Sequence, residues 1–317
     1  MITKRYGSML YKNLNRKSCH HSIKYFQFVS CKLRSSCAEN YPDFIYKKLK
    51  FSDTIYEYEN SLLLLLKIET MEITNGKSDF SKITYAPTGE QSSTRTFLAN
   101  VFLLMFVALG VSALVAWQFS INTYLLSYLI SPTGLTGLGM ITMFAPLGFV
   151  LIMSFGYRRL SASALLTLFI AYAVINGITF SFILMAYTPG SVFGCFLSAS
   201  AMFGVMAFMG YTTNQDLTKF GRILMMGLIG TLIAMVINFF LHSSQLDYII
   251  SIIGVMVFTG LTAYDVQKLK RIGEGLEYSD VSAADTKKMS VLGALNLYLD
   301  FINIFLFLLR LFGGRRN

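Results

Sequence analysis

Charged residues are scarce in this sequence: they make up 14% of its 317 residues, whereas 54% are hydrophobic. Soluble domains carry roughly 25% charged and about 45–50% apolar residues. The shortage of charge, together with 27 Phe and 16 Met, indicates that a large part of the chain faces lipid. The composition therefore excludes a soluble enzyme, a disulfide-linked scaffold and a disordered regulator, and the lipid bilayer is the first predicted partner.

The sequence also lacks the motifs of common active sites. It contains no glycine-rich phosphate loop, and after His21 the only histidine is His242. The four cysteines and the two early histidines have spacings that fit no standard zinc site. The net charge of +10 is not accompanied by a basic patch beside an aromatic reading surface, so nucleic acid is not a predicted partner. We predict no enzyme activity, no catalytic residue, no resident metal and no cofactor.

Long apolar runs are what the sequence has in abundance. A helix needs about 20 apolar residues to cross roughly 30 Å of hydrocarbon. Lipid cannot satisfy backbone polar groups, and the runs lack the alternation of a membrane barrel. The predicted fold class is therefore an all-α integral membrane protein, a seven-helix transmembrane bundle. The predicted spans are residues 97–119, 137–155, 162–187, 192–211, 223–241, 246–263 and 292–312.

The charges in the connections segregate. Those near Arg158, Lys219 and Lys268 carry Lys and Arg, and the positive-inside rule places them in the cytoplasm. The seventh run either crosses the membrane or re-enters it; crossing is favoured because 21 residues suffice to span. The connections without Lys or Arg are 120–136, 188–191 and 242–245.

Residues 1–90 are predicted to be a largely unstructured N-terminal extension or an overlong start, followed by the transmembrane domain at 91–317. Residues 1–38 hold eight basic residues and no acidic residue, which also fits an organelle transit peptide. A small folded domain is a third reading of this part of the chain.

Two acidic residues stand apart. Asp265 lies at the inner end of the sixth run, and Asp300 lies inside the seventh. A charged side chain in mid-helix costs at least about 2.5–3.5 kcal/mol, so Asp300 must face the bundle interior, water or a partner. Asn296 and Asn303 lie on the same helical stripe. The stripe predicts that the seventh helix is central, with these side chains lining a pore.

Each acid also has a plainer interpretation. Asp265 is then an interfacial acid beside Lys268, and Asp300 a structural hydrogen-bonding hub. If instead the two carboxylates meet, like charges force the pair to hold or release a proton near neutral pH. Arg158 or Arg159, at the inner end of the second span, is the expected counter-ion.

Two segments carry a family resemblance: 258–268, FTGLTAYDVQK, and 294–303, ALNLYLDFIN. They resemble the Bax inhibitor-1 (transmembrane Bax inhibitor motif) family, and residues 210–221 and 145–148 resemble its inner loop and the second helix of its bacterial branch. The resemblance implies a central seventh helix and a proton-sensitive calcium leak, with Ca²⁺ as the permeant ion. It places Asp265 and Asp300 in an aspartate latch that is held by an arginine, either Arg158 or Arg159.

The resemblance also implies a multi-pass protein of the bacterial cell inner membrane. The mitochondrial inner membrane is the alternative if residues 1–38 are a transit peptide. Two functions stay open: a pH-sensitive calcium/cation leak channel gated by the aspartate pair, and a non-transporting regulator that binds a membrane-bound protease or other membrane proteins. An intramembrane hydrolase is a weaker third, because aspartyl proteases also share a proton between two acids.

Overall fold

The computed structural model describes residues 64, 67, 92–131, 134–157, 159–277 and 282–316. These residues belong to the second of two compact units, Lys48–Asn317. The first unit, Met1–Lys47, lies outside the described residues, as does most of the predicted extension. That residues 1–90 are unstructured or an overlong start therefore stays a prediction. Leu64 and Lys67 are the residues of this extension that the structure describes.

Seven long apolar helices in the described part of the chain confirm the predicted fold class. A short helix and two antiparallel strands of two residues each lie in the connection between the first two long helices. The elements are α3 (Ser92–Ile121), α4 (Thr123–Ser127), β1 (Ile130–Ser131), β2 (Gly134–Leu135), α5 (Gly137–Gly156), α6 (Ala162–Ala186), α7 (Pro189–Thr212), α8 (Thr218–Leu241), α9 (Ser244–Glu277) and α10 (Ala283–Phe312).

The last two helices are longer than their apolar runs. The first five predicted spans end within five residues of the observed helices, but α9 continues past Ala263 to Glu277 and α10 begins well before Leu292. An apolar run reports only the stretch that lipid requires, whereas a helix continues until its backbone is capped. Ser282 provides the cap of α10, where its hydroxyl accepts a hydrogen bond from the Asp285 amide at 3.1 Å.

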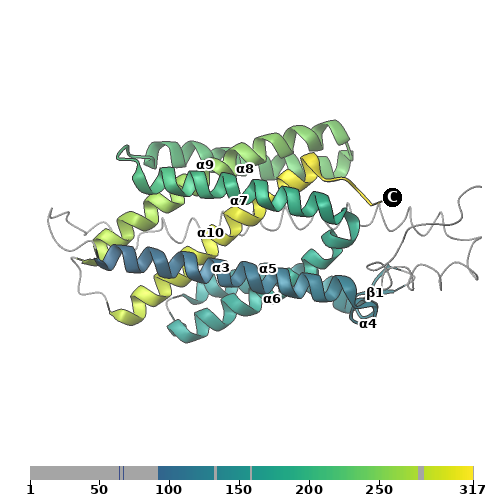
Figure 1. Cartoon of the computed structure of the whole chain (residues 1–317), viewed down its shortest axis with the longest axis horizontal. Coiled ribbons are helices and arrows are strands. Elements are labelled where there is room, and N and C mark those ends of the chain that lie inside the picture. The colour runs from purple at the N-terminus through teal and green to yellow at the C-terminus, as the bar shows by residue number, and fades with distance from the viewer. Residues whose placement is uncertain are drawn as a thin grey trace, which may run out of the picture. The chain divides into compact units, whose positions relative to one another are not determined.

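The seventh long helix, α10, is central, as predicted. Figure 1 shows it running obliquely between α7, α8 and α9 on one side and α3, α5 and α6 on the other. It packs against α9, α3, α7 and α6. Every residue from Ser290 to Leu309 is buried, whereas only 17% of the most apolar window of α7 is buried. The outer helices therefore present their apolar faces to lipid, whereas α10 is enclosed from Ser290 to Leu309.

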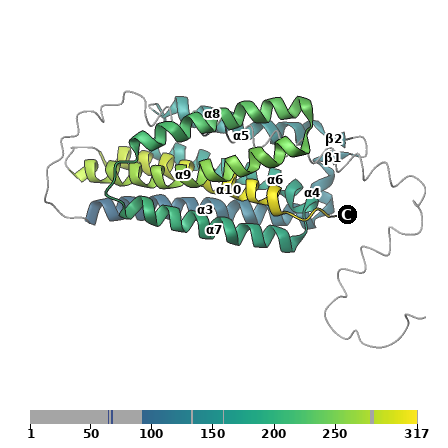
Figure 2. The same ribbon diagram turned by 90° about the horizontal axis from the view of Figure 1, so that it is seen from above.

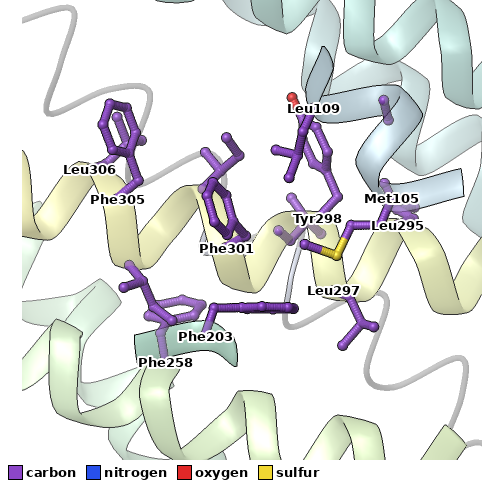
Figure 3. Close-up of a cluster of buried hydrophobic side chains, with 14 of the residues drawn as sticks. Met105, Leu109, Phe203, Phe258, Leu295, Leu297, Tyr298, Phe301, Phe305 and Leu306 are labelled. Carbon is purple, nitrogen blue, oxygen red and sulfur yellow. The ribbon is translucent and has the colours of Figure 1, made fainter. Parts of the chain in front are cut away.

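The core around α10 is built from interlocking aromatic and aliphatic side chains (Figure 3). Phe301 packs edge-to-face on Phe203 of α7 with ring centroids 5.7 Å apart, and Phe258 of α9 lies 6.0 Å from Phe307. Met105 and Leu109 of α3 close the opposite side. Since lipid is as apolar as these side chains, it is close packing rather than escape from water that holds the helices together.

The path of α10 runs from one end of the bundle to the other. It starts beside the end of α9, follows that helix (Figure 2), and finishes at the connection between α6 and α7. There Thr188 donates its amide to the Gly314 carbonyl and Arg316 donates to that of Ala186, both at 2.9 Å. The seventh run therefore traverses the whole bundle and does not turn back within it.

Glycines in the helices divide into two groups. A Cβ added to Gly177 of α6 would lie 2.7 Å from the Ser112 carbonyl oxygen of α3, and one on Gly254 of α9 would lie 2.6 Å from the Phe307 ring. Gly110 and Gly148 have nothing within 4 Å of the same position. Close approach of two helices therefore depends on particular glycines. The spacing of glycines in the sequence does not reveal which ones lie at such contacts.

We predict that Gly177→Ala destabilises the bundle, because the new methyl group meets backbone that cannot rotate away. Overpacking of this kind costs about 1–3 kcal/mol. Gly110→Ala is the matched control, since its methyl group meets open space and alanine favours helix by roughly 0.5–1 kcal/mol. Thermal unfolding of both variants in one detergent should show a lower midpoint only for Gly177→Ala. Equal midpoints would contradict the close α3–α6 contact.

The second prediction concerns topology. Lys219, Ser244 and Arg316 are all exposed, so each can be replaced by cysteine in a background that lacks the four native cysteines. The charge distribution puts position 219 in the cytoplasm and position 244 outside. Because α10 traverses the bundle, position 316 should be outside as well. A membrane-impermeant maleimide on intact cells should label 244 and 316 only, and external labelling at 219 would reverse the orientation.

Candidate functional site

The candidate site lies where α9 and α10 cross near the predicted cytoplasmic end. Asp265 sits on α9 at the point where its apolar part meets the basic residues that follow, and it is 2% exposed. Asp300 lies in the middle of the α10 sequence and is fully buried. Two neighbouring helices thus bring both sequence-predicted acids into one buried place.

Lys67 is the residue that joins them. Its ammonium nitrogen, Nζ, donates a hydrogen bond to Oδ2 of Asp265 and lies 2.9 Å from Oδ1 of Asp300. It also donates to the Asn296 carbonyl oxygen, 3.3 Å away. Two oxygens that share one nitrogen are at most about 6 Å apart, twice a hydrogen-bond length. The predicted meeting of Asp265 and Asp300 is therefore observed, with a cation between them.

Several oxygens at the site are left without hydrogen bonds. Within the described ranges, Oδ1 of Asp265 and Oδ2 of Asp300 have no hydrogen-bond partner, whereas Oδ1 of Asp300 lies in the ion pair with Lys67. The side-chain oxygens of Asn296 and Asn303 on the same face of α10 have none either. Buried acceptors of this kind are costly. The site therefore has the capacity to accept a proton or a water molecule.

Within the described residues, the two carboxylates outnumber the ammonium groups that contact them directly. Two carboxylates face one ammonium between them, and Lys268, one turn beyond Asp265, is partly exposed. Among the described residues, no three His, Cys, Asp or Glu side chains gather as candidate metal ligands. Calcium prefers six to eight oxygens, several of them carboxylate. The two carboxylates and one carbonyl that contact Lys67 are fewer oxygens than calcium prefers.

One of the two arginines expected beside the aspartates does not lie there. Arg159 is exposed in the turn after α5, whereas both carboxylates are buried, so the expected pairing with Arg159 is wrong. Arg158 lies outside the described residues. Spacing along the chain suggested an arginine because the second span ends nearby, but the cation comes from Lys67, about 200 residues away in sequence.

The polar stripe on α10 is buried together with its aromatic neighbours. Asn296 is 4% exposed and Asn303 is fully buried, and the Asn303 amide donates to the Leu299 carbonyl at 2.7 Å. On another face of the helix, the Tyr298 and Ser112 hydroxyl groups are hydrogen-bonded at 2.8 Å. This contact ties α10 to α3, so the stripe is held in a fixed orientation.

Two further ion pairs fasten α9 at its ends, and sequence reasoning missed both. Near the start of α9, Asp247 pairs with Arg310 of α10 at 2.5 Å. Near its other end, Arg271 pairs at 2.8 Å with Asp216 in the connection between α7 and α8. The sequence did contain a signal for the first pair. An acid at the start of α9 and a base near the end of α10 lie at the same end of the bundle when the two helices run antiparallel.

The missed residue with the greatest consequence is Lys67. It lies in the short apolar stretch that begins at Leu62, inside an extension predicted to be unstructured. Nothing in its local spacing links it to Asp265 or Asp300. The available hint is that Lys67 directly follows five leucines, in LLLLLK. A charged side chain next to an apolar run needs a partner when that run is buried.

The fold and this site define a polytopic membrane protein with a diaspartate centre between α9 and the central helix α10. The family profile described as "Inhibitor of apoptosis-promoting Bax1" matches residues 94–317. The chain belongs to the Bax inhibitor-1 family, which confirms the resemblance seen in the sequence. Lys67 lies outside the matched region.

Individual relatives agree with this assignment. The inner membrane protein YbhL of Escherichia coli K12 is 42% identical over 226 residues, which cover 71% of this chain and 94% of YbhL. A protein of Borreliella burgdorferi is 42% identical over 70% of this chain and 93% of its own length. The protein RP147 of Rickettsia prowazekii is 42% identical over 57% of this chain and 75% of its own length. The predicted location in a bacterial inner membrane is consistent with that of YbhL.

The third prediction separates packing from polar lining on α10. Phe301→Ala removes a ring that packs on both Phe196 and Phe203, and such losses cost about 3–5 kcal/mol. Asn303→Leu replaces a buried amide whose oxygen is unpaired by an apolar group of similar size, so stability should not fall. Thermal unfolding in detergent checks both. A large loss for Asn303→Leu would mean that its amide has a structural role.

Proposed function

We propose that the protein is a pH-sensitive calcium/cation leak channel in which Asp265 and Asp300 form the gate and the sensor. One observation carries the proposal: two buried carboxylates on neighbouring central helices share a single ammonium group. Ionisable groups buried among transmembrane helices usually mark a path for ions or protons. The plainer readings, an interfacial acid and an isolated hydrogen-bonding hub, account less well for two acids in one place.

The charge at this site can change by one proton. With both carboxylates and the ammonium ionised, the centre carries one net negative charge and attracts a cation. When a proton binds, the centre is neutral and that attraction falls. Because both acids contact one nitrogen, a proton on either carboxylate changes the charge of the same centre.

The same proton changes how α9 and α10 are held together. At the diaspartate centre the acid of each helix contacts the Lys67 ammonium, whereas the other end of the pair is joined by Arg310 and Asp247. A change of charge between the aspartates therefore alters helix contact near the predicted cytoplasmic end and leaves the opposite end fastened. Such a local change is what a gate requires.

The oxygens along α10 support transient passage of a hard cation. The carboxylates and the unpaired side-chain oxygens of Asn296 and Asn303 are ligands that calcium accepts. They are too few for a tight calcium site, which suits an ion that must leave as readily as it enters. Calcium is thus proposed as permeant ion and not as a bound cofactor.

The fourth prediction tests the gate. Asp265→Asn and Asp300→Asn each keep the shape of the side chain and remove its titration, so each should flatten the dependence of calcium flux on pH. The ratio of the protonated to the deprotonated form of a titrating group changes about tenfold per pH unit, and this is the response that the substitution removes. The double variant should add little, since a coupled pair acts as one unit. Flux into proteoliposomes between about pH 5 and 8 measures it.

Asp216→Asn is the control for this experiment. Hydrogen bonds from the Thr218 hydroxyl and amide, with the Arg271 guanidinium, hold the pKa of Asp216 well below its usual range. Its stabilising ion pair is therefore complete above a pH of about 4 and is lost only at lower pH. The control should keep the wild-type profile. If both single variants kept it too, the gate would be wrong, and the non-transporting regulator of membrane proteins would be the better account.

A further inference from the structure

Lys67 is a buried cation supplied by a part of the chain that precedes the family's domain. The family profile begins at residue 94, so this ammonium group reaches the diaspartate centre from outside the region that defines the fold. It is completely buried, and its nitrogen contacts two carboxylates and a backbone carbonyl. A lysine in such a position is held by the site rather than by the local sequence.

Leu64 shows that the contact involves more than one side chain. It lies three residues before Lys67, both residues are helical, and Leu64 is completely buried in the same apolar core as residues of α3 and α10. Residues three apart on a helix project from the same face. An apolar and a charged side chain from this part of the chain are therefore both buried in the bundle.

The ligands of the Lys67 ammonium are those that a permeating cation would use. Carboxylate and carbonyl oxygens coordinate hard cations, and an ammonium is a compact point charge on a flexible stem. Asp265, Asp300 and the Asn296 carbonyl cannot hold a second cation in the same place while the ammonium is there. Lys67 and an external cation are therefore alternatives for one position.

We propose that Lys67 is an internal competitor: a tethered cation that occupies the diaspartate site and blocks it against external cations. Its release from the site opens that position to a cation such as calcium. The inference rests on the proposed function only for its flux readout, because competition for the site can also be measured as binding. In this arrangement the segment before the family's domain inhibits the domain that follows it.

The fifth prediction uses Lys67→Gln in the full-length protein, with Lys77→Gln as the matched control from the same extension. Loss of the ammonium exposes two carboxylates to external cations. Calcium chloride should therefore raise the thermal unfolding midpoint of Lys67→Gln and leave the wild type and the control unchanged. The added substitution Asp265→Asn should abolish the rise. Calcium flux into proteoliposomes at neutral pH should increase several-fold for Lys67→Gln alone.

The two readouts separate this inference from the proposed function. Calcium-dependent stabilisation of Lys67→Gln without flux in any variant would support the competitor and overturn the leak channel. If Lys67→Gln matched the wild type in both readouts, the competitor would be overturned. Mass spectrometry that found a mature chain beginning after residue 67 would also overturn it.

Two further variants cover the case in which Lys67→Gln does not fold. Lys67→Arg keeps the cation, and Lys67→Gln combined with Asp265→Asn removes one charge of each sign. If the combined variant folds where the single variant does not, Asp265 is the partner of Lys67, and the competitor is supported. If only Lys67→Arg folds, the lysine is a structural counter-ion that the fold requires at all times, and the competitor is overturned.

Discussion

Two carboxylates buried between transmembrane helices are the constraint on which the centre of this protein depends. Neither lipid nor close-packed side chains can solvate a negative charge, so burial of Asp265 and Asp300 requires a cation, a proton or both. Lys67 meets part of that requirement and leaves several oxygens without hydrogen bonds. Pairing stabilises the arrangement, and the part left unpaired makes it responsive to protons and cations. One feature thus serves both the fold and the proposed gate.

The central position of α10 follows from the same constraint. A helix with a polar stripe cannot face lipid, and this one is enclosed by α3, α6, α7 and α9 over twenty successive residues. Enclosure demands close contact on every side, which explains why aromatic side chains interlock around it and why Gly254 must lack a side chain beside Phe307. Packing and polarity therefore act together: the apolar faces determine how tightly α10 is held, and the stripe determines which way it faces.

The pair formed by α9 and α10 is joined by charge at two places with different properties. Arg310 and Asp247 match one base with one acid, which leaves no net charge to adjust. The diaspartate centre has two acids for one lysine, and its lysine comes from outside the family's domain. The asymmetry is the physical basis for proposing that movement occurs at one end only. It also connects the region before α3 with the function of the membrane domain.

The sequence by itself determined the membrane class, the number and approximate limits of the spans, the central seventh helix and the two acids that matter. Each follows from a local property, namely apolar run length, loop charge or helical periodicity. The partner of the acids was decided only by the tertiary structure, because Lys67 reaches them across a separation in sequence that no local pattern encodes, while the nearer Arg159 remains exposed. The same holds for the contacts of Gly177 and for the pairing of Asp247 with Arg310, since an ion pair or a close approach depends on where two helices cross.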